Sequence, residues 1–224
     1  QTFELSKAAI EKWGFYNRNA GINPVMTEGK KTVAIEIAEQ LNWNPTDWVA
    51  ISVGDGCTIG GVYNGFYDLL QLGMIERIPK ILGVQSTGCC PFVDADARGG
   101  ALLPTPENTL ADSIAVGVPR NPIKAQRAVK NSGGKWIAVS DEEILDAMRL
   151  LGRTEGVFGE PAGVTATAGV KAAVEKGIIR PGESVTVVST GSGLKDVKNA
   201  MVAAGEPFKC EPDIRALEES GRIH

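Results

Sequence analysis

The chain has 224 residues, of which 43% are hydrophobic, and it carries a formal net charge of −4. This length accommodates one large α/β domain, or one domain and part of another, with enough apolar side chains for a core. The acidic balance and the absence of a basic run argue against a nucleic-acid surface. No apolar run is long enough to span a membrane, and the first residues show no signal-peptide pattern.

Histidine and cysteine usage narrows the possible chemistry further. The single histidine is His224, the last residue, so a Ser-His-Asp or Cys-His apparatus and multi-histidine metal sites are excluded. The four cysteines follow neither metal-ligand nor disulfide spacing. They are Cys57, Cys89, Cys90 and Cys210. We therefore expect no metal site and a reducing, cytoplasmic location, with chemistry supplied by carboxylates, lysines, hydroxyls or a cofactor.

The first part of the chain predicts two helices that are separated by a loop. An amphipathic pattern over 3–16 indicates the first helix, and apolar residues one turn apart indicate the second over 30–41. Residues 17–29 are predicted to be a loop. A polar turn over 42–47 then leads into the stretch around which the chain is organised.

That stretch is a strand, a glycine turn and a helix in immediate succession. Residues 48–53 are mostly apolar and partly β-branched, which indicates a buried strand, and Gly54-Asp55-Gly56 follows. Glycines let a backbone approach an anion closely, and a helix N-terminus adds partial positive charge. The stretch predicts a phosphate cradle, although the glycine spacing alone fits equally well a tight turn that binds nothing.

The remaining chain alternates strands and helices. Three further strands are predicted over 80–85, 135–139 and 184–189. Helices are predicted around 109–113 and over 122–130, 142–153 and 162–176, the third opened by a capping box of Ser140 and Glu143 and the last by Pro161. Residues 86–106 are rich in Gly and Pro and are predicted to form an irregular loop, and the polar residues after 204 a peripheral tail.

This alternation is typical of an α/β fold with a parallel sheet and helices on both faces. In such sheets ligands bind at the carboxyl ends of the strands. Two glycine loops lie there, one after Val53 and one after Ser189.

The first loop also fits a loose dinucleotide-binding pattern. Gly54, Gly56 and Gly60 give G-x-G-x-x-x-G, which would indicate a nicotinamide or flavin module. That pattern needs an acidic residue at the end of the next strand, which instead ends in Gln85-Ser86. The alternative is therefore disfavoured but stays open.

The second loop, Thr190-Gly191-Ser192-Gly193, is by itself best explained as a simple turn. Its functional alternative is a Thr190 hydroxyl that points into the same crevice as the first loop. Glu160 precedes Pro161 and is best explained as a helix start favoured by the helix dipole. A carboxylate that faces the crevice is the alternative.

Several segments, taken together, resemble a known family. The main ones are residues 54–58, 155–162 and 189–196, with support from 23–24, 28–32, 83–85 and 140–144. Their order and spacing resemble threonine synthases, within the fold-type-II pyridoxal-phosphate enzymes of the tryptophan-synthase-β type. The resemblance covers nearly the whole chain, and the set of motifs carries it rather than any single one.

The resemblance implies pyridoxal 5′-phosphate as cofactor. The 5′-phosphate would be held by the backbone N–H groups of Gly54, Asp55, Gly56, Cys57 and Thr58. The Thr58 hydroxyl would assist, and Thr190 would hydrogen-bond the pyridine nitrogen. A hydroxyl does not stabilise a protonated pyridinium as a carboxylate would, so the ring stays neutral and suits elimination and replacement chemistry.

The resemblance also implies an organisation and a reaction. The chain resembles the C-terminal two-thirds of an enzyme that converts O-phospho-L-homoserine and water to L-threonine and phosphate, as a homodimer. Residues 1–16 would be a remnant of the smaller domain, 17–205 the cofactor-binding domain and 206–224 a tail. The alternatives are another pyridoxal-phosphate elimination or replacement enzyme, a nicotinamide-binding domain and a non-catalytic binding module.

Three departures from the family pattern matter. The family's Schiff-base lysine lies in an N-terminal segment that these residues do not include. Met26 stands where the family often has a phosphate-binding arginine. Asp55 replaces a common amide, and because a carboxylate beside a phosphate dianion is unfavourable, we expect it to turn away and cap the helix or bind backbone.

Overall fold

The computed structural model of the protein describes residues 2–220, and His224 lies outside them. Its centre is a four-stranded parallel sheet in the order β3-β2-β1-β4. The strands are β1 (Trp48–Ser52), β2 (Lys80–Ser86), β3 (Lys135–Val139) and β4 (Val185–Val188). All four predicted strands are confirmed, and the fold is α/β as expected.

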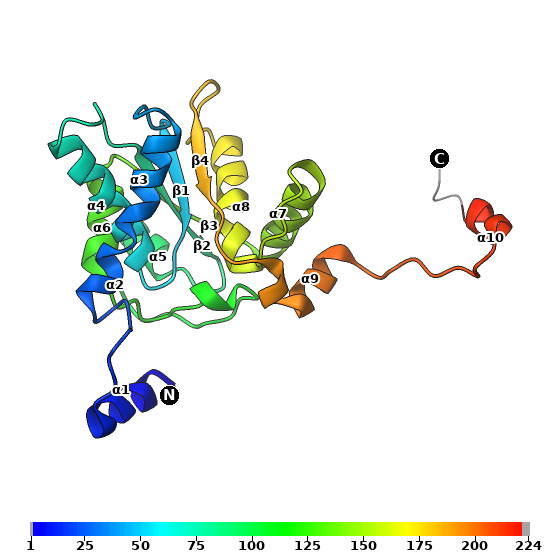
Figure 1. Cartoon of the computed structure of the whole chain (residues 1–224), viewed down its shortest axis with the longest axis horizontal. Coiled ribbons are helices and arrows are strands. Elements are labelled where there is room, and N and C mark those ends of the chain that lie inside the picture. Colours follow the sequence, from blue (N-terminus) through cyan, green and yellow to red (C-terminus); the bar gives the residue numbers. More distant parts are fainter. Residues whose placement is uncertain (1, 221–224) are drawn as a thin grey trace.

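Helices cover both faces of the sheet (Figure 1). One face carries α3 (Lys31–Gln40), α4 (Cys57–Gln71) and α6 (Pro122–Asn131), and the other carries α7 (Asp141–Thr154) and α8 (Pro161–Glu175). A shorter helix, α9 (Val197–Ala204), packs beside α7. The capping box that opens α7 is present, with Ser140 and Glu143 bonded reciprocally.

The strand β1 separates two hydrophobic clusters. Val49 and Ile51 point to the α4 side, where Phe66 is fully buried, whereas Trp48 and Ala50 point to the α8 side. Since successive side chains of a strand alternate between faces, a strand buried on both faces must be apolar throughout. This is the physical reason that the run 48–53 lacks polar alternation.

The packing of α8 on the sheet requires small residues. A side chain at Gly169 would place its Cβ only 2.4 Å from a methyl carbon of Val84 on β2. This close approach leaves ten residues of α8 buried, distributed around much of the helix. The helix therefore lies tightly against the centre of the sheet and holds its N-terminus at the carboxyl edge.

Two predicted loops contain helices. Residues 17–29 include α2 (Pro24–Glu28), in which the Asn23 side chain accepts the N–H of Val25 and Pro24 occupies the first turn. These are local N-terminal signals, so the helix was predictable from its own residues.

The predicted helix around 109–113 is instead a single 3₁₀ turn over Asp112–Ile114.

The prediction that residues 86–106 form an irregular loop is wrong in part, because the segment contains α5 (Pro91–Arg98). Its first N–H groups are not capped locally. Those of Phe92 and Val93 donate to the Gln85 side-chain oxygen, which projects from β2. Gln85 is fully buried, so this cap depends on tertiary structure and could not be inferred from the spacing of Gly and Pro.

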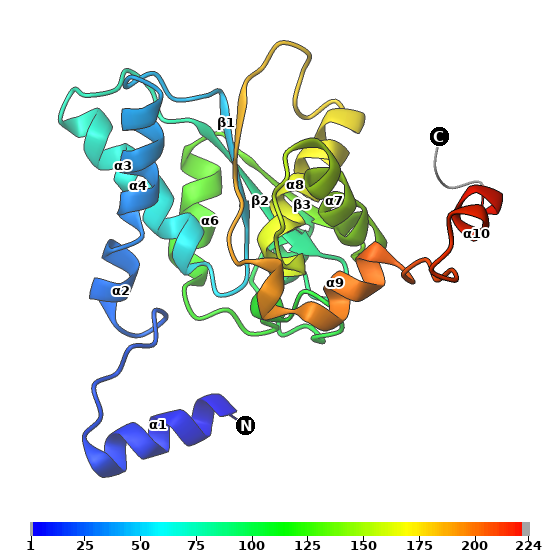
Figure 2. The same ribbon diagram turned by 45° about the vertical axis from the view of Figure 1, so that its right-hand side comes forward.

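The two terminal helices lie away from the sheet (Figures 1 and 2). They are α1 (Thr2–Trp13) and α10 (Ile214–Glu219), and neither contains a buried residue. The division into 1–16, 17–205 and 206–224 stays a prediction. Among the described residues, no helix has the length and apolar character needed to cross a membrane.

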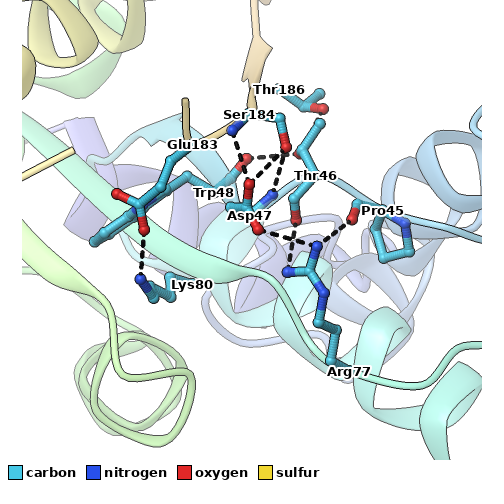
Figure 3. A network of polar contacts seen from close by, with 9 residues as sticks. All are labelled: Pro45, Thr46, Asp47, Trp48, Arg77, Lys80, Glu183, Ser184 and Thr186. Carbon is cyan, nitrogen blue, oxygen red and sulfur yellow. Dashed lines mark hydrogen bonds and ion pairs between the residues drawn. The ribbon is translucent and has the colours of Figure 1, made fainter. Parts of the chain in front are cut away.

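A network of ion pairs and hydrogen bonds joins the strands at the amino edge of the sheet (Figure 3). The Asp47 carboxylate accepts the N–H and hydroxyl of Ser184 at 2.8 and 2.9 Å and pairs with Arg77 at 3.1 Å. Lys80 pairs with Glu183 at 2.8 Å. These contacts hold the starts of β1, β2 and β4 together, opposite the edge where the glycine loops lie.

The network predicts an acid-dependent loss of stability. The hydrogen bond from Lys80, followed by the Arg180 N–H, lowers the pKa of Glu183 from 4.5 to about 2. Between these values the unfolded chain binds a proton that the folded chain does not, so the free energy of unfolding should fall as pH drops from about 4.5 to about 2. Urea unfolding across this range should show a shallower fall for Glu183→Gln.

The matched control is Glu39→Gln, which removes an exposed α3 carboxylate. Within residues 2–220, Glu39 belongs to no ion pair. It should leave the pH dependence unchanged. An unaltered slope for Glu183→Gln would contradict the assignment.

Candidate functional site

The turn between β1 and α4 has a backbone shape that requires glycine. Gly56 has φ of 84° and stands at the N-cap of α4. A Cβ there would lie 2.7 Å from the Ala125 Cβ and 2.9 Å from the Asn121 carbonyl oxygen. The left-handed conformation and the lack of space both exclude a larger residue. The turn therefore redirects the chain from the centre of the sheet straight into a helix.

This turn leaves a run of backbone donors without protein acceptors. Within the part of the chain that the structure describes, no hydrogen bond engages the N–H groups of residues 54–59. The first paired N–H of the helix is that of Gly60, which donates to the Gly56 oxygen at 3.2 Å. Six successive donors at the N-terminus of a 15-residue helix form a concentrated site of partial positive charge.

The residues that carry these donors line a cavity of about 200 Å³. Residues 52–59 form most of its wall, and Ala20, Lys30, Ser113 and Val116 complete it. All five residues that the sequence predicts for phosphate binding in this turn therefore line one cavity. Lys30 adds a cationic side chain. The sequence analysis assigned it no role, although it lies in segment 28–32, which supports the family resemblance. Among the described residues Lys30 forms no ion pair.

Asp55 binds backbone, as expected, but it does not cap the helix. Its Oδ1 accepts the N–H of Arg120 at 3.1 Å and the Nη1 of the same residue at 3.0 Å. No side chain caps the N-terminus of α4. The sequence analysis missed Arg120, which lies 65 residues away in a proline-rich turn.

Cys57 contributes an uncharged side chain to the cavity wall. Burial raises the pKa of its thiol, while the hydrogen bond from the Asn121 amide opposes that shift. The Asn121 Nδ2 lies 3.1 Å from the Cys57 Sγ. A protonated thiol adds no negative charge beside the six donors.

The second glycine loop leaves the same edge of the sheet. Val188 of β4 pairs with Ile51 of β1, and because the strands are parallel, the loops that follow them emerge side by side. The Thr190 N–H donates to the Gly163 oxygen at 3.3 Å, while its side chain is exposed. Thr190 does not belong to the wall of the 200 Å³ cavity. The structure thus brings the loops to neighbouring strand ends without joining them in that cavity.

Glu160 stands at the N-cap of α8, as the helix-start interpretation expects, and its side chain has a further structural role. Its carboxylate is buried and pairs with the Lys195 ammonium at 3.0 Å, and it accepts no N–H of α8. A Cβ at Gly191 would overlap the Glu160 carboxylate, so glycine is required there. The Glu160 N–H also donates to the Gly191 oxygen at 3.0 Å. Glu160 and Lys195 therefore fasten the second loop to the start of α8.

Gln85 weighs against the dinucleotide alternative. The position that would hold a ribose is fully buried, and its amide donates to the Val53 oxygen while its oxygen caps α5. Its side chain cannot face a ligand at the strand end. Within residues 2–220, no cluster of three or more His, Cys, Asp or Glu side chains could hold a metal ion.

Comparisons with known proteins agree with this geometry. Residues 1–191 match the sequence family described as pyridoxal-phosphate dependent enzyme. The chain is 42% identical over 200 residues to threonine synthase of Methanocaldococcus jannaschii, covering 88% of this chain and 49% of that protein. It is 39% identical over 202 residues to threonine synthase of Mycobacterium bovis, covering 89% and 54%. The chain thus spans about half the length of the curated relatives it matches.

Solved structures share the fold. Diaminopropionate ammonia lyase from Escherichia coli, in complex with D-serine, superposes with a TM-score of 0.72 at 20% identity, covering 90% of this chain and 54% of that one. The processed form of threonine deaminase isoform 2 from Solanum lycopersicum gives 0.67 at 23% identity, covering 81% and 49%. The family match extends over more than half of the chain, and it shows that this protein belongs to the pyridoxal-phosphate dependent enzymes.

Proposed function

We propose that this chain forms the cofactor-binding part of a threonine-synthase-type enzyme, a lyase that converts O-phospho-L-homoserine and water to L-threonine and phosphate. The observation that carries the proposal is the run of six unpaired N–H groups over the N-terminus of α4. A phosphate dianion is the natural acceptor for such a run. The identity of 42% with a threonine synthase supports the substrate.

The residues of the cavity fit a phosphate group. The N–H groups of residues 54–58 would bind its oxygens, the Thr58 hydroxyl would add a donor, and the Lys30 ammonium would balance its charge. The one carboxylate among the wall residues, that of Asp55, is paired with the Arg120 guanidinium. These features support the assignment of the 5′-phosphate of pyridoxal phosphate to this cavity.

Thr190 would serve the other end of the cofactor. When bound, pyridoxal phosphate supplies an electron sink for negative charge that develops on an amino-acid substrate. Thr190 has a hydroxyl without a hydrogen-bond partner in residues 2–220, and it follows the end of β4, the strand that pairs with β1. As an uncharged donor it would hold the pyridine nitrogen neutral, which suits elimination and replacement at the substrate's side chain.

The substrate, compartment and assembly belong to the same proposal. Met26 lies in α2, and its thioether carries no charge to pair with a substrate phosphate, in contrast to the arginine that the family often has there. The four free cysteines support a reducing compartment such as the cytoplasm. We keep the homodimer as the expected assembly of the complete enzyme.

The test of the reaction uses the complete gene product with pyridoxal phosphate. Incubation with O-phospho-L-homoserine should release equal amounts of phosphate and L-threonine, measured by colorimetry and amino-acid analysis. A visible absorbance band that borohydride abolishes, without either product, would contradict the substrate and favour another elimination or replacement reaction. Binding of a nicotinamide nucleotide in place of pyridoxal phosphate would contradict the cofactor assignment as well.

The phosphate cradle predicts a specific effect of Gly56→Ala. The new methyl group meets the Asn121 oxygen and Ala125 and opposes the left-handed φ, so pyridoxal phosphate should bind at least about tenfold more weakly by titration calorimetry. Gly73→Ala is the matched control, because Gly73 also has positive φ, 68°, but faces open space. Equal losses in both variants would contradict a local role for the turn.

The proposed hydrogen bond from Thr190 to the pyridine nitrogen gives a second prediction. Thr190→Val should weaken the binding of pyridoxal phosphate about fivefold, since one hydrogen bond of an uncharged donor is lost. Inorganic phosphate should bind this variant as it binds the unaltered chain. Thr190→Ser, which keeps the hydroxyl, should restore the affinity for pyridoxal phosphate. An equal loss for inorganic phosphate would show that Thr190 acts on the cradle rather than on the ring.

A further inference from the structure

A carboxylate in the wall of an anion site needs an explanation. Asp55 lies between the two glycines of the turn and belongs to the cavity wall. A second negative charge a few ångströms away would oppose binding of a phosphate, since like charges at that range repel. A residue outside the turn pairs with this carboxylate.

This residue is Arg120, which donates two hydrogen bonds to Asp55. Its backbone N–H and its Nη1 both donate to Asp55 Oδ1, at 3.1 and 3.0 Å. The two side chains are each about one-third exposed, at 30% and 31%, so the pair is partly shielded from water. The guanidinium carbon also lies 4.0 Å from the ring centre of Phe3, which limits its freedom.

We propose that Arg120 is the positioning residue that makes this turn competent to bind an anion. It draws the Asp55 carboxylate away from the donors and cancels its charge. Arg120 is absent from the cavity wall, so it acts through Asp55 and not on the ligand. The inference rests on the proposed function, because it concerns the same phosphate cradle.

Asn121, the residue next to Arg120, adds further contacts to the turn. The Asn121 N–H donates to the Asp55 carbonyl oxygen at 2.9 Å, and its side-chain amide reaches the Cys57 sulfur at 3.1 Å and the Ala20 oxygen at 3.2 Å. Residues 120–121 therefore grip the turn on both sides of Gly56. These contacts hold the turn that carries the six N–H groups in place, and removal of the arginine should loosen it.

A double-mutant cycle on the full 224-residue chain tests the proposal. Arg120→Met keeps an unbranched stem and removes the charge, whereas Asp55→Asn removes the carboxylate. With Asp55 present, Arg120→Met should weaken both pyridoxal phosphate and inorganic phosphate at least about tenfold at low ionic strength. In the Asp55→Asn background the same change should cost less than about twofold, because no carboxylate remains to be held away from the donors.

The matched control is Arg127→Met, which removes a cation from the exposed side of α6. Among residues 2–220, Arg127 forms no ion pair. It should leave both affinities unchanged. An equal loss for Arg120→Met in both backgrounds would overturn the proposal, because Arg120 would then bind the anion directly. No loss in either background would overturn it too.

A second measurement needs no ligand. The Asn121 amide contacts the Cys57 sulfur, and Arg120 holds this segment against Asp55. Arg120→Met should therefore raise several-fold the rate at which iodoacetamide alkylates Cys57, measured by mass spectrometry of the peptide. Cys89 is also buried and serves as an internal reference whose rate should not change. An unchanged Cys57 rate would overturn the positioning role. If the unaltered chain binds neither probe, the proposed cofactor site fails, and the alkylation result alone decides whether Arg120 holds the turn.

Discussion

The candidate anion site depends on a run of backbone donors that have no acceptors among residues 2–220. Backbone N–H groups are almost always paired in folded proteins, and an unmet donor away from water costs free energy. Here residues 54–59, which carry six successive groups of this kind, line one cavity of about 200 Å³. A helix can hold such an arrangement only if its own position is rigid. The packing of α4 against α3, α6 and the central strand provides that rigidity.

The two edges of the sheet have different roles. At the amino edge, carboxylates, hydroxyls and cations are matched in a network that joins three strands. At the carboxyl edge, two loops on neighbouring strands present N–H groups and a hydroxyl that have no partner in the part of the chain that the structure describes. The buried Glu160, paired with Lys195, fixes the second loop to α8. In the first loop, Gly56 permits close packing against Ala125 and Asn121. The matched polar network and the unpaired groups thus lie at opposite edges of the sheet.

The charge of the cavity is controlled by residues from separate parts of the chain. Lys30 brings a cation from the start of α3, Cys57 stays protonated, and Arg120 engages the carboxylate of Asp55. Together they allow a sequence with a carboxylate in its glycine turn to retain an anion site. The family pattern alone does not explain how Asp55 is tolerated, whereas the Arg120 contact does.

The sequence by itself determined the four parallel strands, the long helices α3, α4, α6, α7 and α8 and the two glycine loops at the carboxyl edge. These features follow from short-range properties: apolar runs for strands buried on both faces, helical periodicity, and caps such as the Ser140–Glu143 box. Its failures at α2 and α5 differ in kind. The signals for α2 were local and were overlooked, whereas α5 is capped by Gln85 from a neighbouring strand.

The tertiary structure alone decided which side chains meet. Asp55 and Arg120 are 65 residues apart, and Glu160 and Lys195 are 35 apart, so neither pair leaves a periodic or spacing signal in the chain. Likewise, the inclusion of Lys30 in the cavity and the exclusion of Thr190 from it depend on how helices pack around the strand ends. Local patterns specify elements because they arise from interactions within a few residues, but charge compensation requires the distances that only folding sets.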